Sequence, residues 1–117
     1  MALTADIVRA AFAGLPPVES DDVFERGKQV AARLCAVIDA VREGSEIADV
    51  GFWAFNVQII LKNGDQWTIE CLSRDAFRMY PDGANIWVRQ TDMDIDELVK
   101  DINDVAYRTT KEEFENA

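Results

Sequence analysis

The fold of this chain is decided by residues 50–71, VGFWAFNVQIILKNGDQWTIEC. In the first half of this stretch, residues 50–61, large apolar side chains alternate with small or polar ones. The apolar set is Trp53, Phe55, Val57, Ile59 and Leu61, and the set between them is Ala54, Asn56 and Gln58. A period of two predicts a half-buried antiparallel strand, with the apolar set facing the core.

The turn that follows sets the register of the next strand, residues 66–71. A two-residue loop would place the polar Thr68 opposite Ile59. A three-residue loop over residues 62–64, with Gly64 in the left-handed conformation, places Trp67 opposite Ile59 and keeps the apolar side chains of both strands on one face. We predict the second register because the first would bury polar side chains. It also predicts the pairs Val57–Ile69 and Phe55–Cys71.

A second hairpin is predicted around residues 80–83, YPDG, whose proline and glycine favour a type I turn. Its arms are residues 76–80 and 84–90. The first arm is open to an alternative, because residues 74–79 could equally form a single helical turn.

Three helices flank the strands. The first is capped by Thr4, carries Val8, Phe12 and Leu15 on one side, and ends at Gly14 and residues 16–17, PP. The second begins near residues 20–22 and runs to residues 42–44, with one buried stripe at helical spacing. The third is predicted from Asp94 as N-cap, with Glu97 completing a capping box and residues 93 and 98 forming a hydrophobic staple.

These elements predict an α+β fold of two layers. An antiparallel, three- to four-stranded β-meander packs against helices in the order α-α-β-β-(β)-β-α. A chain of 117 residues is the usual size of one domain, so residues 1–117 are expected to form a single domain, with residues 111–117 frayed.

The formal net charge of −10, from 22 acidic and 12 basic residues, restricts the partners. Nucleic acid and anionic membranes would be repelled by most of such a surface. The first residues lack the basic and apolar regions of a secretory leader, and the sequence contains no apolar run long enough to span a bilayer. We therefore expect a cytoplasmic protein that binds neither nucleic acid nor membrane directly.

Catalytic and metal-binding side chains are scarce. The sequence has no histidine, so the usual serine or cysteine nucleophile lacks its base. Cys35 and Cys71 are expected to be reduced core thiols rather than a disulfide. Residues 92–96 begin like a calcium-binding loop, but Glu97 and Asn103 stand where that loop needs glycine and glutamate. Glu70 is the only acid flanked by apolar positions, and alternation turns it outward. We predict a protein that is not an enzyme and takes no cofactor or metal.

Residues 92–115 form the most acidic segment, with nine acids and three bases. This pattern fits either a solvated helix face or a docking surface for a basic protein or nucleoprotein complex, where carboxylates take the place of phosphates. The candidate partner-binding acids are Asp92, Asp96, Glu97, Asp101, Asp104, Glu112 and Glu113.

The second candidate surface is the outward face of the sheet. Alternation turns Phe52 outward, and either Trp87 or its two neighbours must also point outward. Exposed aromatic side chains there would form an interface anchor. A second helix layer or a homodimer could equally cover them, and the three alternatives stay open.

In composition alone, the chain is similar to three functional groups: inhibitors from phages and mobile elements, including anti-CRISPR proteins and DNA mimics, toxin-immunity proteins, and acidic secretion chaperones. The leading hypothesis is a non-enzymatic inhibitor that docks on a basic, nucleic-acid-handling complex. The alternative is an acidic chaperone or immunity protein that binds one cognate protein through its aromatic sheet face.

Overall fold

The computed structural model describes residues 3–15, 22–82 and 92–106. Its helices and strands, in chain order, are α1 (Ala5–Phe12), α2 (Val23–Val41), β1 (Ile47–Trp53), β2 (Asn56–Leu61), β3 (Gln66–Cys71), β4 (Phe77–Pro81) and α3 (Ile95–Ala106). The order α-α-β-β-β-β-α confirms the predicted α+β class.

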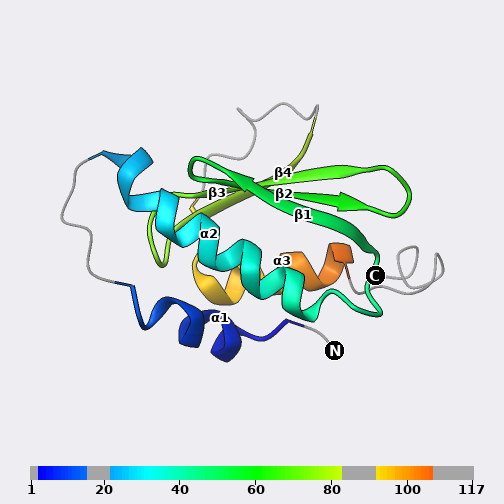
Figure 1. Ribbon diagram of the computed structural model, residues 1–117, viewed down its shortest axis with the longest axis horizontal. Coiled ribbons are helices and arrows are strands. Elements are labelled where there is room, and N and C mark those ends of the chain that lie inside the picture. The colour runs from blue at the N-terminus through cyan, green and yellow to red at the C-terminus, as the bar shows by residue number, and fades with distance from the viewer. Residues whose placement is uncertain (1–2, 16–21, 83–91, 107–117) are drawn as a thin grey trace.

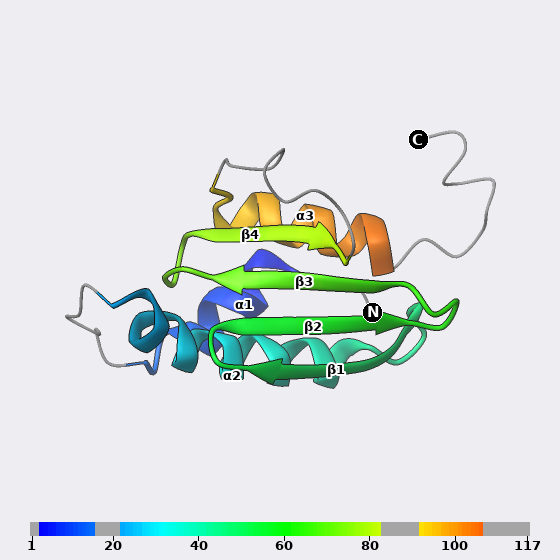
Figure 2. The ribbon, with the colours of Figure 1, turned by 90° about the horizontal axis from the view of Figure 1, so that it is seen from above.

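The four strands form one antiparallel meander with the order β1-β2-β3-β4. The helices lie together on one face of this sheet, as Figure 1 shows. Seen through the sheet in Figure 2, α2 runs beneath β1 and β2, and α3 lies beside β4. Helix α1 packs against α2 and α3. In the described part of the chain, the opposite face of the sheet carries no helix.

The turn between β2 and β3 has the predicted register. Val57 lies opposite Ile69 and Ile59 lies opposite Trp67. Gly64 has a φ of +94° and its N–H donates to the Leu61 carbonyl at 2.9 Å. The three-residue loop with a left-handed glycine is therefore confirmed.

The prediction of a single strand over residues 50–61 is wrong. The chain reverses at residues 54–55, so that Trp53 lies opposite Asn56 in the neighbouring strand. Ala54 has a φ of 54°, a conformation that usually requires glycine or asparagine. Tertiary contacts hold it there. The Phe55 ring packs edge-on against Phe24 at 5.5 Å between centroids, and its carbonyl accepts the Cys71 N–H at 2.8 Å.

The helix starts follow the sequence. A side-chain oxygen at each N-cap accepts a hydrogen bond from a backbone N–H of the first turn, at 3.2, 2.9 and 2.9 Å for Thr4, Asp22 and Asp94. These bonds satisfy donors that a helix start leaves without an internal partner. The three predicted helices are therefore confirmed.

The core fills the space between the helices and the sheet. Phe12 of α1 stacks on Phe77 of β4 with ring centroids 6.2 Å apart, and both are buried. Helix α2 approaches the sheet closely at Gly27, where an added Cβ would stand 1.9 Å from the Cys71 carbonyl oxygen. The absence of a side chain at residue 27 is what allows this approach.

Residues 77–81 form a strand, which confirms the first arm of the second hairpin over the helical-turn alternative. The second arm at residues 84–90, with Trp87, and the expected fraying of residues 111–117, with Glu112 and Glu113, lie outside the described residues.

Candidate functional site

The acidic residues around α3 are largely engaged within the molecule. The Arg78 Nε donates to Asp92 Oδ1 at 3.0 Å, and the Arg9 Nη2 donates to Asp96 Oδ2 at 2.9 Å. Asp94 caps the helix. The three carboxylates of residues 92–96 therefore have three separate structural partners instead of converging on a cation. The described residues contain no cluster of potential ligands suited to a metal ion.

The next two acids of α3 are also less available than the sequence suggested. Asp101 and Asp104 are half-buried and both make contacts within the protein. Glu97 is exposed. Fewer carboxylates of α3 are therefore solvated and unpaired than the sequence predicted. The helix still contributes negative electrostatic potential.

Large exposed hydrophobic side chains gather at the other candidate surface. Among the described residues they are Trp53, Phe52 and Phe24, which are 76%, 52% and 45% exposed. Phe52 and Trp53 end β1, directly before the turn, and Phe24 contacts Phe55 inside that turn. We call these three residues the aromatic end of the sheet. In Figure 2 the β1–β2 turn and the first turn of α2 lie at the same end of the molecule.

The two neighbouring aromatic residues take opposite faces to those predicted. Phe52 lies opposite the buried Val57 and so belongs to the helix-covered face, at its exposed edge. Trp53 lies opposite Asn56 and belongs to the open face. The reversal at residues 54–55 causes the change. In a single strand Trp53 would share the face of Val57, but the pairing across the turn sets Phe52 opposite Val57 instead.

A groove of about 380 Å³ crosses the open face beside Trp53. Its lining residues are Asp49, Gly51, Phe52, Trp53, Asn56, Gln58, Ile60 and Thr68. Asp49 is the one charged residue among these described lining residues. Space remains open above Gly51, where an added Cβ would meet no atom within 4 Å.

The polar side chains of Gln58 and Thr68, which line this groove, already use hydrogen-bond donors within the protein. The Gln58 amide nitrogen donates to Asp82 at 2.9 Å and to Gln66 at 3.2 Å, and the Thr68 hydroxyl donates to Asp82 at 2.7 Å. Asn56 Oδ1 is buried and has no hydrogen-bond partner among the described residues. An unpaired buried acceptor costs about 1–3 kcal/mol. A ligand N–H that met Oδ1 after a rotation of the Asn56 side chain would recover this cost.

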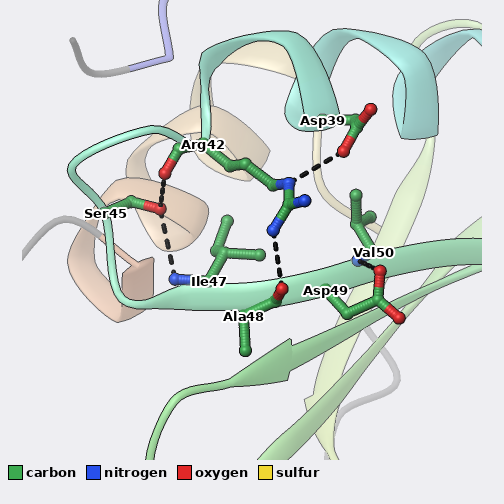
Figure 3. A network of polar contacts seen from close by, with 7 residues as sticks. All are labelled: Asp39, Arg42, Ser45, Ile47, Ala48, Asp49 and Val50. Atoms are coloured by element: carbon green, nitrogen blue, oxygen red, sulfur yellow. Dashed lines mark hydrogen bonds and ion pairs between the residues drawn. The ribbon is translucent and has the colours of Figure 1, made fainter.

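The outer edge of β1 is closed along its first half, as Figure 3 shows. The Arg42 Nη1 donates to the Ala48 carbonyl at 2.6 Å, and its Nε donates to Asp39 at 2.8 Å. The Asp49 carboxylate accepts its neighbouring N–H, that of Val50, at 2.9 Å. These contacts occupy backbone groups that an edge strand otherwise presents to another chain.

A second hollow, of about 530 Å³, is lined partly by Arg26, Glu70, Arg78 and Asp92. Its charges are mixed. Arg78 pairs with Asp92, and the Glu70 carboxylate accepts a hydrogen bond from the Tyr80 hydroxyl at 2.8 Å. Glu70 lies on the open face, as predicted, opposite Asn56 and Arg78. Its carboxylate is therefore held in a polar contact and does not stand in the apolar setting that a general acid needs.

Both cysteines are free and buried, as expected. Burial raises the pKa of each thiol, and the charges of Asp39 and Asp49 raise that of Cys35 further. Higher thiol pKa values reduce the thiolate population, so neither residue has the character of a nucleophile.

Comparison of this chain with known protein families, curated proteins and solved structures finds no match. Among the described residues, no helix combines the length and the apolar character needed to cross a bilayer.

Sequence patterns identified Phe52 as exposed but placed it on the wrong face of the sheet, and they missed Trp53 and Phe24 as surface residues. Trp53 was placed in the core by an alternation that runs unbroken through the turn. Phe24 carries no sequence signal of exposure, because it stands three residues before Gly27 and seven before Ala31, in line with the buried stripe of α2.

Proposed function

We propose that this protein is a non-enzymatic, cytoplasmic binding protein that recognises one basic protein partner, and that the aromatic end of its sheet anchors the complex. The observation that carries the proposal is the gathering of Trp53, Phe52 and Phe24 at one end of the fold. Aromatic side chains of this kind dominate the binding energy of protein interfaces.

The charge of the chain supports a basic partner. A net charge of −10 accelerates encounter with a positive surface, and its effect reaches beyond direct contacts. Large basic surfaces are typical of proteins that handle nucleic acid. Occupying such a surface blocks it, and this corresponds to the inhibitory role of an anti-CRISPR or DNA-mimic type of protein that the composition suggests.

The contacts of α3 favour the aromatic end as the anchor. Asp92 and Asp96 each have an arginine partner within the molecule, and Asp94 is committed to the helix cap. These contacts offset part of the negative charge that α3 offers to a partner. The proposal therefore combines the basic partner of the leading hypothesis with the aromatic interface of the alternative, and it assigns α3 to long-range attraction.

The test begins with capture of the partner on the immobilised protein, its identification by mass spectrometry, and its purification. Dissociation constants are then measured for Trp53→Ala, Phe52→Ala and Phe24→Ala. At least one of these variants is expected to weaken binding about tenfold or more, equivalent to about 1.4 kcal/mol. Gln66→Ala is the matched control, because it changes an exposed residue at the opposite end of the same sheet face.

The acidic contribution is measured on the triple variant Asp96→Asn, Asp101→Asn, Asp104→Asn, with circular dichroism as the check on folding. It is expected to slow association at low salt and to match the parent when salt screens the charges. If the triple variant loses affinity through faster dissociation while all three aromatic variants bind like the parent, the proposed anchor is wrong. A partner without a basic surface would contradict the proposed partner class.

A further inference from the structure

The groove beside Trp53 has the geometry of a site for a flat group. Its floor is the backbone at Gly51, above which the space is open, and one side is the Trp53 ring. The other side is formed by Asn56 and Gln58 on the neighbouring strand. A planar guest can therefore lie on the strand backbone with one face or edge against the indole.

The polar chemistry of the groove selects a guest that donates hydrogen bonds. Asn56 Oδ1 is buried with no hydrogen-bond partner in the described part of the chain, and Asp49 lines the edge of the groove. Gln58 and Thr68 already donate to Asp82 and Gln66, so their remaining capacity is as acceptors. Among the described residues, no lysine or arginine lines the groove to supply a competing positive charge.

These features together discriminate between cations. A quaternary ammonium group would interact with the indole face but has no N–H for Asn56 Oδ1. A lysine ammonium is compact and strongly hydrated. A guanidinium is planar, stacks on aromatic rings, and presents five N–H donors. It fits the flat floor, the indole and the acceptors at once.

We propose that this groove binds the guanidinium group of an arginine side chain supplied by the partner protein. This inference builds on the proposed function, because it names the chemical group of the basic partner that the open face recognises. The arginine stacks against Trp53 and has its charge balanced by Asp49, and it donates to Asn56 Oδ1 once the Asn56 side chain turns this buried oxygen toward the groove.

The probe is the peptide acetyl-Gly-Arg-Gly-amide, added to the ¹⁵N-labelled protein and followed by NMR. Saturable shifts are expected for the backbone of Gly51, the indole N–H of Trp53 and the side-chain amide of Asn56. The matched peptide with citrulline in place of arginine keeps the shape and removes the charge, so it should cause little change. The lysine peptide and choline should bind more weakly than the arginine peptide.

Variants then separate the contacts. Trp53→Ala should weaken peptide binding about threefold or more, in line with a lost cation–π contact. Asn56→Leu should also weaken it, whereas Asn56→Asp should strengthen it, because a charged acceptor forms a stronger bond to guanidinium. Glu43→Gln, which also removes one negative charge but at an exposed position just after α2, is the control and should bind the peptide like the parent.

Equal shifts from the arginine and citrulline peptides, or shifts centred away from residues 49–58, would overturn the arginine site. So would weaker binding by a correctly folded Asn56→Asp variant. None of these results would remove the proposed function, which is decided by the captured partner and by the aromatic variants. Conversely, if the aromatic variants bound the captured partner like the parent, the proposed anchor would be wrong, but the peptide result would still hold as a property of the groove.

Discussion

Trp53 and Asn56 face each other across the two-residue turn between β1 and β2. This pairing places the indole on the open face of the sheet, next to the Asn56 amide oxygen, which is buried and has no hydrogen-bond partner within residues 3–15, 22–82 and 92–106. It also leaves Phe52 on the other face, at the margin of the helix layer. One turn thus distributes two adjacent aromatic side chains over both faces of the same sheet end.

The close approach of α2 to the sheet predicts that a side chain at residue 27 lowers the stability of the fold. In Gly27→Ala the added Cβ would meet the Cys71 carbonyl oxygen at 1.9 Å and the Phe55 Cβ at 2.6 Å. Alanine favours a helix over glycine by about 1 kcal/mol, but overpacking costs about 1–3 kcal/mol or more when the obstructing atoms are held by backbone. We expect a net loss of stability, measured by urea denaturation.

The control for this prediction is Gly14→Ala, where the added Cβ meets nothing within 4 Å. It should stay within about 0.5 kcal/mol of the parent. A Gly27→Ala variant as stable as the Gly14→Ala variant would mean that α2 does not lie against β3 at this distance.

The left-handed turn predicts a conformational cost at Gly64. Because its φ is +94°, Gly64→Val forces a branched residue into a region that such residues avoid. A loss of about 1–3 kcal/mol is expected in the same denaturation experiment. Gly64→Asn, which tolerates positive φ better, should lose less. Equal stability of the valine variant and the parent would contradict the turn.

The two turns of the β1–β2–β3 meander show where sequence patterns succeed and fail. At residues 62–64 the turn residues and the alternation of the strands favour the same register. At residues 54–55 neither signal is present: Ala54 is no marker of a left-handed turn, and the apolar alternation runs on from Trp53 to Leu61. The turn there depends on Phe24 and Gly27, which approach it from α2.

The candidate site shows a similar division. Composition revealed the acidity of residues 92–106 but not which charges are neutralised. Asp96 is paired with Arg9, 87 residues away in the sequence, and Asp92 with Arg78. Such pairs depend on tertiary structure, so counting charges overestimated the free carboxylates of α3. The exposure of Trp53 was hidden for the same reason, because it follows from strand pairing.

A pH dependence is predicted for Tyr80. Burial, followed by the hydrogen bond from its hydroxyl to Glu70 and the charges of Glu70 and Asp82, raises its pKa from 10.0 to about 12. The native fold therefore favours the neutral phenol. This contribution to stability is complete below about pH 10 and is lost as pH rises through about 12.

Absorbance of the phenolate during an alkaline titration measures this shift. One of the two tyrosines in the sequence should ionise late, and Tyr80→Phe should remove the late component. Glu70→Gln should lower the midpoint, since it removes a negative charge beside the hydroxyl. Ionisation of Tyr80 at its ordinary pKa in the folded protein would contradict the contact with Glu70.

Opening the edge of β1 predicts self-association. In Arg42→Ala the Ala48 carbonyl loses the Nη1 donor that lies 2.6 Å away, so the edge strand presents an unpaired acceptor to a second copy. The lost ion pair with Asp39 is exposed, and such pairs contribute about 0–1 kcal/mol, so folding should change little. Sedimentation velocity should detect dimers of this variant at protein concentrations where the parent is monomeric.

The control for this prediction is Arg33→Ala, which removes the same charge from an exposed position of α2 and should stay monomeric. If the parent already dimerised through β1, with the amides of residues 48–52 protected from hydrogen exchange by the second copy, Arg42 and Asp49 would not close this edge.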